Sequence, residues 1–592
     1  MAGYIRQYKR DALMSPLCTI GCVILEILIP YMTASIIDQG IAAGNMAHVV
    51  KTGLIMAVMA LTALFFGVTA NRFSARASTG FACNLREAMF ENIQDFSFSN
   101  IDKFSTAGLV TRLTTDVTNV QMAFQMLMMV CTRAPVTLTV ALVMALSINM
   151  KLSVIFLFVM ALLITALFIL MPLSMKYFKQ MFKKYDMVNS ALKENVGAIR
   201  VVKAFVREEH ESGKFRDAAK ELFDNSVSAE KIISFNHPIM MGCVYTCIML
   251  ISWFGAKMIV GGTGLTTGQL TSLLSYVMNI LMSLMMLSMV FVMMTQSFAA
   301  AQRIEEVLDE KSDIVSPENA VMRVADGSID FEDVAFSYRK DKTGKPVLSD
   351  INLHIRSGET IGVIGGTGSS KSSLVNLISR LYDVDSGSVK VGGVDVRDYD
   401  IETLRSEVAV VLQKNVLFSG TILENLRWGD ENATLEQCRE ACRLACADEF
   451  IERMPDKYET RIERGGTNVS GGQKQRLCIA RALIRKPKVL ILDDSTSAVD
   501  TATDAKIRTA LKTYLPDTTK IIIAQRIASV EDADRVLVMD EGKVNAFDTP
   551  ARLLETCAIY QEVYSSQAGS GSGDFDEEAK KDRREEKGGE RV

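Results

Sequence analysis

The sequence predicts a polytopic α-helical membrane domain with six transmembrane helices, followed by an α/β domain that carries a phosphate-binding loop. Three observations lead to this fold class. Charge is unevenly divided, because residues 1–310 hold 25 Lys and Arg and 21 Asp and Glu, whereas residues 311–592 hold 40 and 48. The first part contains apolar stretches of about 20 residues, the length that crosses a bilayer. The second part alternates short β-branched runs with helical patterns, which predicts parallel strands joined by crossover helices.

Whole-chain composition excludes several classes of protein. A length of 592 residues predicts more than one domain. A net charge of −4 and a pI near 5.9 argue against a nucleic-acid-binding protein, which would carry a basic surface. Eleven Cys are too few for a disulfide scaffold and fit thiols in a reducing compartment. Basic residues precede the first apolar run, as in a signal peptide, but no small-residue cleavage site is evident, so we expect a retained helix.

Six apolar stretches are candidate transmembrane helices. They lie at about residues 15–37, 50–72, 127–148, 152–173, 235–260 and 268–296. The connection at 174–234 holds 12 Lys and Arg, whereas the three short connections together hold only Lys151. The positive-inside rule therefore places the long connections and both termini in the cytoplasm. The alternative, a buried soluble helical bundle, is disfavoured by the span lengths and this charge bias.

The long connections at 73–126 and 174–234 are also predicted to be helical, because apolar residues recur at helical spacing and Pro and Gly are almost absent. We interpret them as membrane helices that continue into the cytoplasm. Composition then sets the domain boundaries. We expect a transmembrane domain with two long cytoplasmic loops at 1–310, a linker at 311–326, a soluble domain at 327–566 and a disordered charged tail at 567–592.

The segment GGTGSSKSS is a candidate phosphate-binding loop. It follows the strand-like run TIGVI and opens a helical pattern, which is the context that such a loop requires. Backbone N–H groups at a helix N-terminus bind phosphate oxygens, Lys371 would contact the β- and γ-phosphates, and Ser372 would hold Mg²⁺. The pattern has Gly where Ser370 stands. The expected nucleotide-binding residues are Gly365, Gly366, Thr367, Gly368, Ser369, Ser370, Lys371, Ser372 and Ser373.

Two further motifs accompany this loop. The run LILDDSTSAVD at 490–500 is an apolar strand that ends in acids, and Asp493 at its end is placed to hold Mg²⁺ through water. The run NVSGGQKQRL at 468–477 supplies Ser470, Gly471, Gly472 and Gln473 before a helix. With six spans ahead of them, these motifs in this order resemble an ATP-binding cassette (ABC) half-transporter of the exporter type, over about residues 1–565. The resemblance implies a P-loop ATPase domain that uses ATP and Mg²⁺.

The resemblance also implies roles for individual residues. Tyr338 resembles the aromatic residue that stacks on adenine, and Gln413 resembles the residue that senses Mg²⁺ and contacts the membrane domain. Ser470 to Gln473 resemble the signature that clamps the γ-phosphate of an ATP held by a partner domain. Asp500 resembles an aspartate that crosses the dimer interface, and Glu463 the acid of an exporter cross-contact. Alternatively, each of them is a loop residue that serves only to form a turn.

Three departures from the family pattern concern hydrolysis. Asp494 stands where the family has a general-base Glu, so the carboxylate is one methylene shorter, although a base must come within about 2.6–3.2 Å of its proton. Gln525 stands where the family has a His, and Ser370 is the third departure. The signature is intact apart from Val469. We therefore expect a degenerate ATP site in a heterodimer, whose non-identical partner half-transporter supplies the missing Glu and His.

Other segments bear on coupling and cargo. Residues 98–117 and 199–211 resemble the family's two coupling segments. Alternatively, these residues form ordinary solvated helix–turn–helix tips. Glu26 lies in mid-span and would either attract cationic substrates or pair with Arg133. The sixth span places on one face Met278, Met282, Met285, Met286, Met289 and Met293, which would line a cargo cavity, face lipid or pack in the core.

The sequence therefore predicts a subunit of a heterodimeric, multidrug-type ABC exporter in the plasma membrane. It would move amphipathic small molecules, drugs or lipids, out of the cell by alternating access, with hydrolysis mainly at the site formed with the partner's motifs. The alternatives are a peptide exporter, an importer with this fold, or an ATP-gated channel or sensor. Besides the partner half-transporter, the bilayer and the cargo, no nucleic-acid partner is expected.

Overall fold

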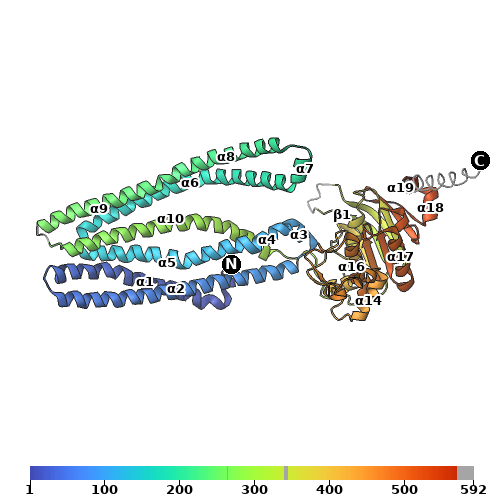
Figure 1. Cartoon of the computed structure of the whole chain (residues 1–592), viewed down its shortest axis with the longest axis horizontal. Coiled ribbons are helices and arrows are strands. Elements are labelled where there is room, and N and C mark those ends of the chain that lie inside the picture. Colours follow the sequence, from blue (N-terminus) through green and yellow to red (C-terminus); the bar gives the residue numbers. More distant parts are fainter. Residues whose placement is uncertain (263, 339–344, 570–592) are drawn as a thin grey trace, which may run out of the picture. The chain divides into compact units, whose positions relative to one another are not determined.

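The computed structural model describes residues 1–262, 264–338 and 345–569. The chain divides into two compact units. One comprises Met1–Gln94 with Thr106–Glu310, and the other comprises Asp95–Ser105 with the chain from Lys311 onward. The second unit therefore includes a short segment from the first third of the sequence. Figure 1 shows that the first unit consists of long helices, whereas the second contains sheets and shorter helices.

Long helices make up the first unit. Their bounds are α1 (Lys9–Ser35), α2 (Met46–Gln94), α4 (Thr106–Thr111), α5 (Val117–Ile148), α6 (Met150–Gly197), α7 (Ile199–Ala204), α8 (Glu208–Ser234), α9 (Asn236–Val260) and α10 (Thr267–Asp309). A 3₁₀-helix (Ala2–Tyr8) precedes α1, and π-helical turns lie at Ile36–Ile41 and Arg112–Asp116. In Figure 1, α1 lies beside α2, and α6 lies beside α8.

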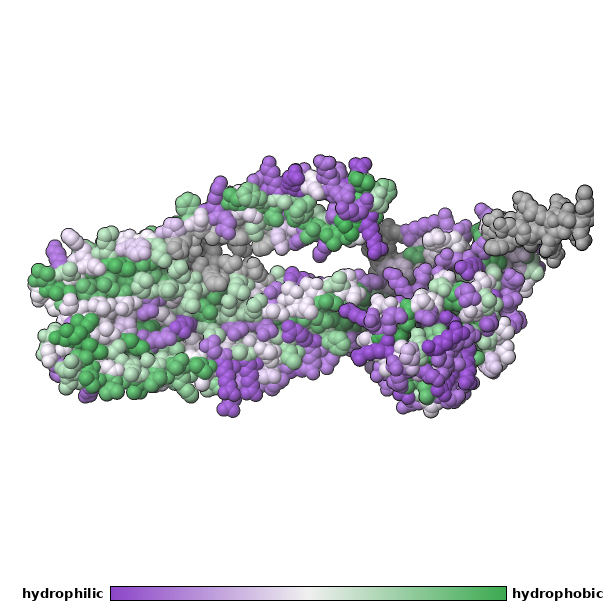
Figure 2. Space-filling model, in the orientation of Figure 1, coloured by the Kyte–Doolittle hydropathy of each residue, from purple (hydrophilic) through white to green (hydrophobic). Residues whose placement is uncertain are grey.

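Several of these helices are apolar enough to cross a membrane. Within the described residues, five qualify by length and composition, at Gly3–Ile41, Met46–Gln94, Thr106–Ile148, Pro238–Val260 and Thr267–Leu287. The span expected at 152–173 lies in α6, where the described apolar stretch is the shorter Met150–Leu162. The count of six spans therefore stays a prediction. Figure 2 shows apolar residues over α1, α2 and α9, and hydrophilic residues along α8.

Polar contacts fix α10 against its neighbours inside the helical unit. The Arg303 guanidinium donates two hydrogen bonds, of 2.8 and 2.6 Å, to the buried Asp116 carboxylate. Nearer the start of α10, the buried Tyr276 hydroxyl donates to the Ile27 carbonyl at 3.1 Å. Buried polar groups are costly unless they are paired, so these bonds specify how α10 packs on α1 and α5.

Two main sheets form the second unit. The six-stranded sheet has the order β12-β11-β3-β10-β9-β6, in which all neighbours are parallel except β12 and β11. Its strands are β3 (Thr360–Gly365), β6 (Val408–Val411), β9 (Val489–Asp493), β10 (Thr519–Ile523), β11 (Arg535–Asp540) and β12 (Lys543–Asp548). An antiparallel sheet has the order β2-β1-β4-β5, from β1 (Ile329–Phe336), β2 (Leu348–Ile355), β4 (Ser386–Val391) and β5 (Val394–Asp395). A two-stranded ribbon pairs β7 (Gly420–Thr421) with β8 (Arg461–Ile462).

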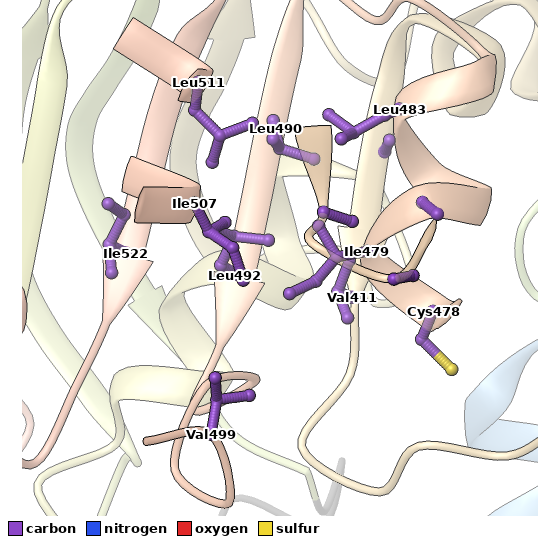
Figure 3. Close-up of a cluster of buried hydrophobic side chains, with 14 of the residues drawn as sticks. Val411, Cys478, Ile479, Leu483, Leu490, Leu492, Val499, Ile507, Leu511 and Ile522 are labelled. Carbon is purple, nitrogen blue, oxygen red and sulfur yellow. The ribbon is translucent and has the colours of Figure 1, made fainter. Parts of the chain in front are cut away.

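Helices cover the parallel sheet, as its continuous hydrophobic strands require. Its strands are contacted by α11 (Lys371–Ile378), α12 (Ile401–Glu407), α16 (Gly471–Ile484), α17 (Thr501–Tyr514) and α18 (Pro550–Thr556). The other helices of this unit are α13 (Ile422–Leu426), α14 (Leu435–Leu444), α15 (Asp448–Ile451) and α19 (Ala558–Gly569). Figure 3 shows Leu490 and Leu492 of β9 in one buried cluster with Ile479 of α16 and Ile507 of α17. The core therefore fixes both helices on the strand that ends in Asp493. The expected tail at 567–592 lies outside the described residues from position 570.

Candidate nucleotide-binding site

The phosphate-binding loop predicted from the sequence connects β3 to α11. Gly365 ends β3 with a φ of +155°, and a Cβ at this position would lie 2.3 Å from the Met539 carbonyl oxygen and 2.6 Å from Ser369 Oγ. Since β11 pairs Met539 with Gly365, no side chain fits between the two strands here. Glycine is therefore required for the backbone to turn out of the sheet and into the loop.

Ser370 is the N-cap residue of α11 and has a left-handed backbone conformation, with φ +69° and ψ +23°. A residue with a Cβ pays about 1–2 kcal/mol for this conformation, whereas Gly adopts it freely. The departure noted in the sequence therefore falls where the loop geometry favours glycine. The loop keeps its turn at a cost in free energy.

The ammonium group of Lys371 lies inside the loop. Its Nζ donates hydrogen bonds to the carbonyl oxygens of Gly365 and Gly366, at 2.9 and 2.8 Å, and to Ser369 Oγ at 3.2 Å. Burial lowers the pKa of Lys371, while the carboxylates of Asp493 and Asp494 act in the opposite direction. A cation held among loop carbonyls near two acids is suited to bind phosphate oxygens.

The two acids follow the neighbouring strand β9. Asp493, its last residue, is buried, and burial raises its pKa; the hydrogen bond from Ser372 acts in the opposite direction, and the charge of Asp494 raises it further. Strand pairing aligns Asp493 with Ile523 of β10. A buried carboxylate bonded to a serine hydroxyl is a donor set that Mg²⁺ accepts, so Ser372 and Asp493 fit the metal role expected of them.

Asp494 contacts both glutamines that the sequence singled out. Gln525 Nε2 donates to Asp494 Oδ2 at 3.0 Å, and Gln413 is the second amide bonded to this carboxylate. The three residues meet because Gln413 follows β6, Asp494 follows β9 and Gln525 follows β10, three adjacent parallel strands. Burial raises the pKa of Asp494, against the two amide hydrogen bonds. An amide donates a hydrogen bond but carries no charge and takes no proton at neutral pH, so Asp494 is the only base of this trio.

Tyr338 lies beside the phosphate-binding loop. It follows β1, is 46% exposed, and its hydroxyl is 2.9 Å from Ser373 Oγ of α11. Its ring packs against Phe336 and Tyr382, with centroids 4.9 and 5.1 Å away. An exposed ring held by two aromatic neighbours next to a phosphate loop is placed to stack on a nucleobase.

The signature residues begin α16. Ser470 is its N-cap, and a capping box joins it to Gln473: Gln473 N–H donates to Ser470 Oγ at 3.3 Å, and Ser470 N–H donates to Gln473 Oε1 at 2.9 Å. Gly472 lies so close to the loop after β9 that a Cβ would be 2.7 Å from the Ala498 carbonyl. The signature is thus an ordered helix N-terminus, the kind of site that binds anions.

Gln475 ties the signature helix to the loop after β9, a role that the motif analysis did not assign. Its buried amide accepts from Ala498 N–H at 3.0 Å and donates to Ser497 Oγ at 3.2 Å. The signal in the sequence was its position five residues after Ser470, in the run that continues the signature. Nearby, Asp500 caps α17 by accepting from Thr503 N–H at 2.9 Å, and Glu463 accepts from Thr467 at 2.8 Å.

Part of the predicted first coupling segment folds into the unit that holds the phosphate loop. Helix α3 (Phe98–Phe104) belongs to that unit, and Tyr382 donates a hydrogen bond from its hydroxyl to Asp102 Oδ2 at 2.8 Å. The Phe98 ring lies 6.0 Å from that of Tyr382. Tyr382 therefore contacts both Tyr338 and the coupling segment. No sequence pattern predicts this contact, since Tyr382 stands 280 residues from Asp102. The second segment, 199–211, forms α7 and the start of α8.

In the helical unit, the Glu26–Arg133 pairing is confirmed, because Arg133 Nη2 donates to Glu26 Oε2 at 2.5 Å. Among the methionines of α10, Met278, Met282 and Met286 are exposed, and Met285 packs against the core. The side chain of Met289 lies outside the described residues.

The fold and the site define a membrane protein that joins one helical transmembrane unit to one P-loop nucleotide-binding unit. Comparison with known proteins places it in a family. The model of the ABC transporter transmembrane region matches residues 12–285, and the ABC transporter model matches residues 348–497. This chain belongs to the ABC transporter family as a half-transporter, with an ATP-binding domain whose hydrolysis drives transport.

Relatives match nearly the whole chain. The uncharacterized ABC transporter ATP-binding protein YfiB of Bacillus subtilis is 35% identical over 566 residues, covering 96% of this chain and 98% of its own length. YknU of the same organism is 30% identical over 569 residues, covering 95% of this chain and 96% of its own. A solved bacterial Atm1-family ABC exporter with ATP bound shares the fold, with a TM-score of 0.80, 22% identity, and coverage of 95% of this chain and 99% of that one.

Proposed function

We propose that this chain is one subunit of a heterodimeric ABC exporter that moves amphipathic drugs or lipids out of the cell by alternating access. Its own ATP site would bind nucleotide and hydrolyse it slowly, while its signature would complete a competent site on a non-identical partner. The observation that carries the proposal is the trio at the strand ends. There Asp494 replaces the longer acid, and Gln525 holds its carboxylate at 3.0 Å.

Each residue would have a defined part in the degenerate site. Tyr338 would stack on adenine, and Gly365 to Ser373 would bind the phosphates, with Lys371 neutralising their charge. Ser372, Asp493 and Gln413 would hold Mg²⁺, which neutralises charge on the phosphates. Asp494 would activate water poorly, because its carboxylate is shorter and bonded to two amides.

The signature would act in the other site. Ser470, Gly471, Gly472 and Gln473 would present the N-terminus of α16 to the γ-phosphate of an ATP bound by the partner, where a helix N-terminus stabilises negative charge. Since Gln475 bonds to the loop after β9, a movement of the signature would reach the segment that follows Asp494. Asp500 and Glu463 would lie at the interface with the partner.

The domain plan of the proposal is 1–310 for the membrane part, 311–326 for the linker, 327–566 for the ATPase and 567–592 for the tail. The 12 basic residues at 174–234 support cytoplasmic long loops and termini, in a multi-pass protein of the plasma membrane.

ATPase measurements on the chain alone and on the heterodimer test the proposal. The partner would be the half-transporter encoded beside this chain, provided that it carries the general-base Glu and the His. In lipid nanodiscs, we expect the chain alone to hydrolyse Mg-ATP about 10² times more slowly than the pair, which is the contribution of a positioned base. Replacing the partner's Glu by Gln should remove most of the pair's activity, whereas Asp494→Asn should remove little. Fast hydrolysis and transport by the chain alone would refute the heterodimer.

Inside-out vesicles containing the pair test the transport step. Uphill, ATP-dependent accumulation of an amphipathic dye is the expected result. ATP-dependent ion flux without accumulation would instead assign an ATP-gated channel, and accumulation of peptides alone would assign a peptide exporter.

A further inference from the structure

A cavity of about 440 Å³ lies among α1, α2, α5 and α10 in the helical unit. This volume is in the range of small-molecule binding sites. Its lining combines apolar, uncharged polar and charged side chains, represented by Met282, Met286, Asn71, Asn279, Glu26 and Arg133. The ion pair of the first and third spans is therefore not sealed in the helix packing but borders an open space.

The pair leaves hydrogen-bonding capacity unused toward the cavity. Arg133 has five N–H donors, and within the part of the chain that the structure describes one of them is engaged, with Glu26 Oε2 at 2.5 Å. Among the described residues, the other carboxylate oxygen, Oε1, accepts only the weak donor Cys22 Sγ, at 3.4 Å. The side chains of Arg133 and Glu26 are 42% and 41% exposed.

This arrangement differs from that of a structural ion pair. In the same unit, Arg303 and Asp116 share two hydrogen bonds, and the Asp116 side chain is only 2% exposed. Charges within a membrane are expensive, and a pair offsets its desolvation only when hydrogen bonds satisfy both groups. Glu26 and Arg133 meet this condition only in part, because a single hydrogen bond joins them and, among the described residues, only Cys22 adds a weak one, so each keeps exposed polar atoms for a ligand.

We infer that this cavity binds an amphipathic zwitterion, with its anionic group on the free N–H edge of Arg133 and its cationic group at Glu26. The apolar part of the ligand lies along Met282 and Met286, whose flexible thioethers adapt to different chains. Asn71 and Asn279 add hydrogen-bonding groups beside the charges. That the bound zwitterion is also the transported cargo rests on the proposed function. Binding itself requires neither ATP nor the partner.

Equilibrium binding to the full chain in phosphatidylglycerol nanodiscs, without ATP, tests the site. Four labelled probes share a dodecyl chain and are used below their micellar concentrations: dodecyldimethylglycine (a zwitterion), dodecyltrimethylammonium, dodecanoate and dodecanol. Binding to empty nanodiscs is subtracted. We expect the zwitterion to bind about tenfold more tightly than dodecanol, since two charged contacts are added.

Substitutions assign the two charges. Glu26→Gln should weaken the zwitterion and the cation but leave the anion, whereas Arg133→Gln should weaken the zwitterion and the anion but leave the cation. Thr139→Ala is the matched control, because Thr139 lies on α5, is not among the lining residues and bonds its own helix at Pro135. If a single variant does not fold, the exchange Glu26→Arg with Arg133→Glu keeps the pair and should keep the preference for the zwitterion.

Equal binding of all four probes, or an equal effect of both substitutions on every probe, would overturn the inference and leave a structural pair. A second set of nanodiscs that contain phosphatidylethanolamine identifies the source of the zwitterion. Loss of probe binding there assigns a lipid headgroup as the occupant, and unchanged binding assigns a small molecule; both results support the site. Because the assay omits ATP, the site would stand even if the chain proved to hydrolyse ATP as a homodimer, which would refute only the proposed function.

Discussion

At the start of α16, Ser470 and Gln473 bond each other's backbone N–H groups, and Gln475 fixes the helix to its neighbouring loop, so this region is well ordered by its own hydrogen bonds. At the carboxyl ends of the parallel strands, by contrast, Asp494 is bonded by two amides that carry no charge and take up no proton. The phosphate loop after β3 also turns through a left-handed Ser370. The two regions belong to one folded unit. Their difference is the basis of our proposal that the chain gives its signature to a partner and completes its own catalysis poorly.

The largest effect should come from the signature. In the heterodimer, Gly471→Glu places a negative charge where the γ-phosphate would bind, and we expect ATPase activity to fall by about 10²-fold or more. The Cβ itself is tolerated, since it would lie 3.5 Å from Ala498 Cβ. Lys371→Ala in this chain's own phosphate loop should cause a smaller loss. Equal losses in the two variants would remove the contrast between the two regions.

Ser370→Gly should sharpen the contrast by repairing one defect. Relief of the left-handed conformation should stabilise the nucleotide-binding unit by about 1 kcal/mol, less the entropy that glycine adds to the unfolded chain. Thermal unfolding should shift upward by about 2 °C. Thr367→Gly, in the same loop but without a positive φ, is the control and should lower the unfolding temperature. If the unfolding temperature fell in both variants, the backbone at Ser370 would not be strained.

Tyr382→Phe tests whether Tyr382, which packs beside the phosphate loop, also holds α3 of the coupling segment in place. The change removes the hydrogen bond to Asp102 and keeps the ring packing, for a loss of about 1 kcal/mol. Amide hydrogen exchange in residues 98–104 should accelerate about fivefold. Tyr514→Phe, at an exposed position on α17, should leave it unchanged. Unaltered exchange in Tyr382→Phe would mean that α3 is held by other contacts.

The smallest effect concerns pH. Burial raises the pKa of Asp494, so the folded protein binds this proton more tightly than the unfolded chain does. Below the unfolded pKa of about 3.9, the protonated carboxyl does not lower the free energy of unfolding. As pH rises through the folded pKa, the group loses its proton and the folded state is destabilised. Without Mg²⁺, Asp494→Asn should raise the unfolding temperature at pH 8 and have no effect near pH 4. If the difference in unfolding temperature between Asp494→Asn and the unmodified chain did not vary with pH, burial would not be what shifts the pKa of Asp494.

Much of the site could be predicted because its motifs are local. The turn at Gly365, the cap at Ser470 and the acids after β9 each follow from a short run of residues and its flanking elements. The family resemblance placed Asp494 and Gln525 in one ATP site, but the hydrogen bond between them depends on β9 and β10 being neighbours. The turn, the cap and the acids needed no knowledge of long-range packing, whereas this hydrogen bond did.

The remaining features depend on contacts between distant residues. Nothing near Tyr382 indicates that it bonds to Asp102, or that residues 95–105 join the second unit. The sequence allowed Glu26 either a ligand or Arg133, and only the packing of α1 against α5 decides that they pair. Side-chain pairing across hundreds of residues is set by tertiary packing, which periodicity and spacing do not encode.

Single-turnover ATP hydrolysis by the purified full chain, compared with the double variant Asp494→Glu and Gln525→His, tests the central claim most directly. Because the signature is intact, two copies of the repaired chain would form competent sites, and we predict a rate increase of about 10²-fold. Asp494→Glu alone should give a smaller increase. An unmodified chain that already hydrolyses ATP as fast as the double variant would contradict the account.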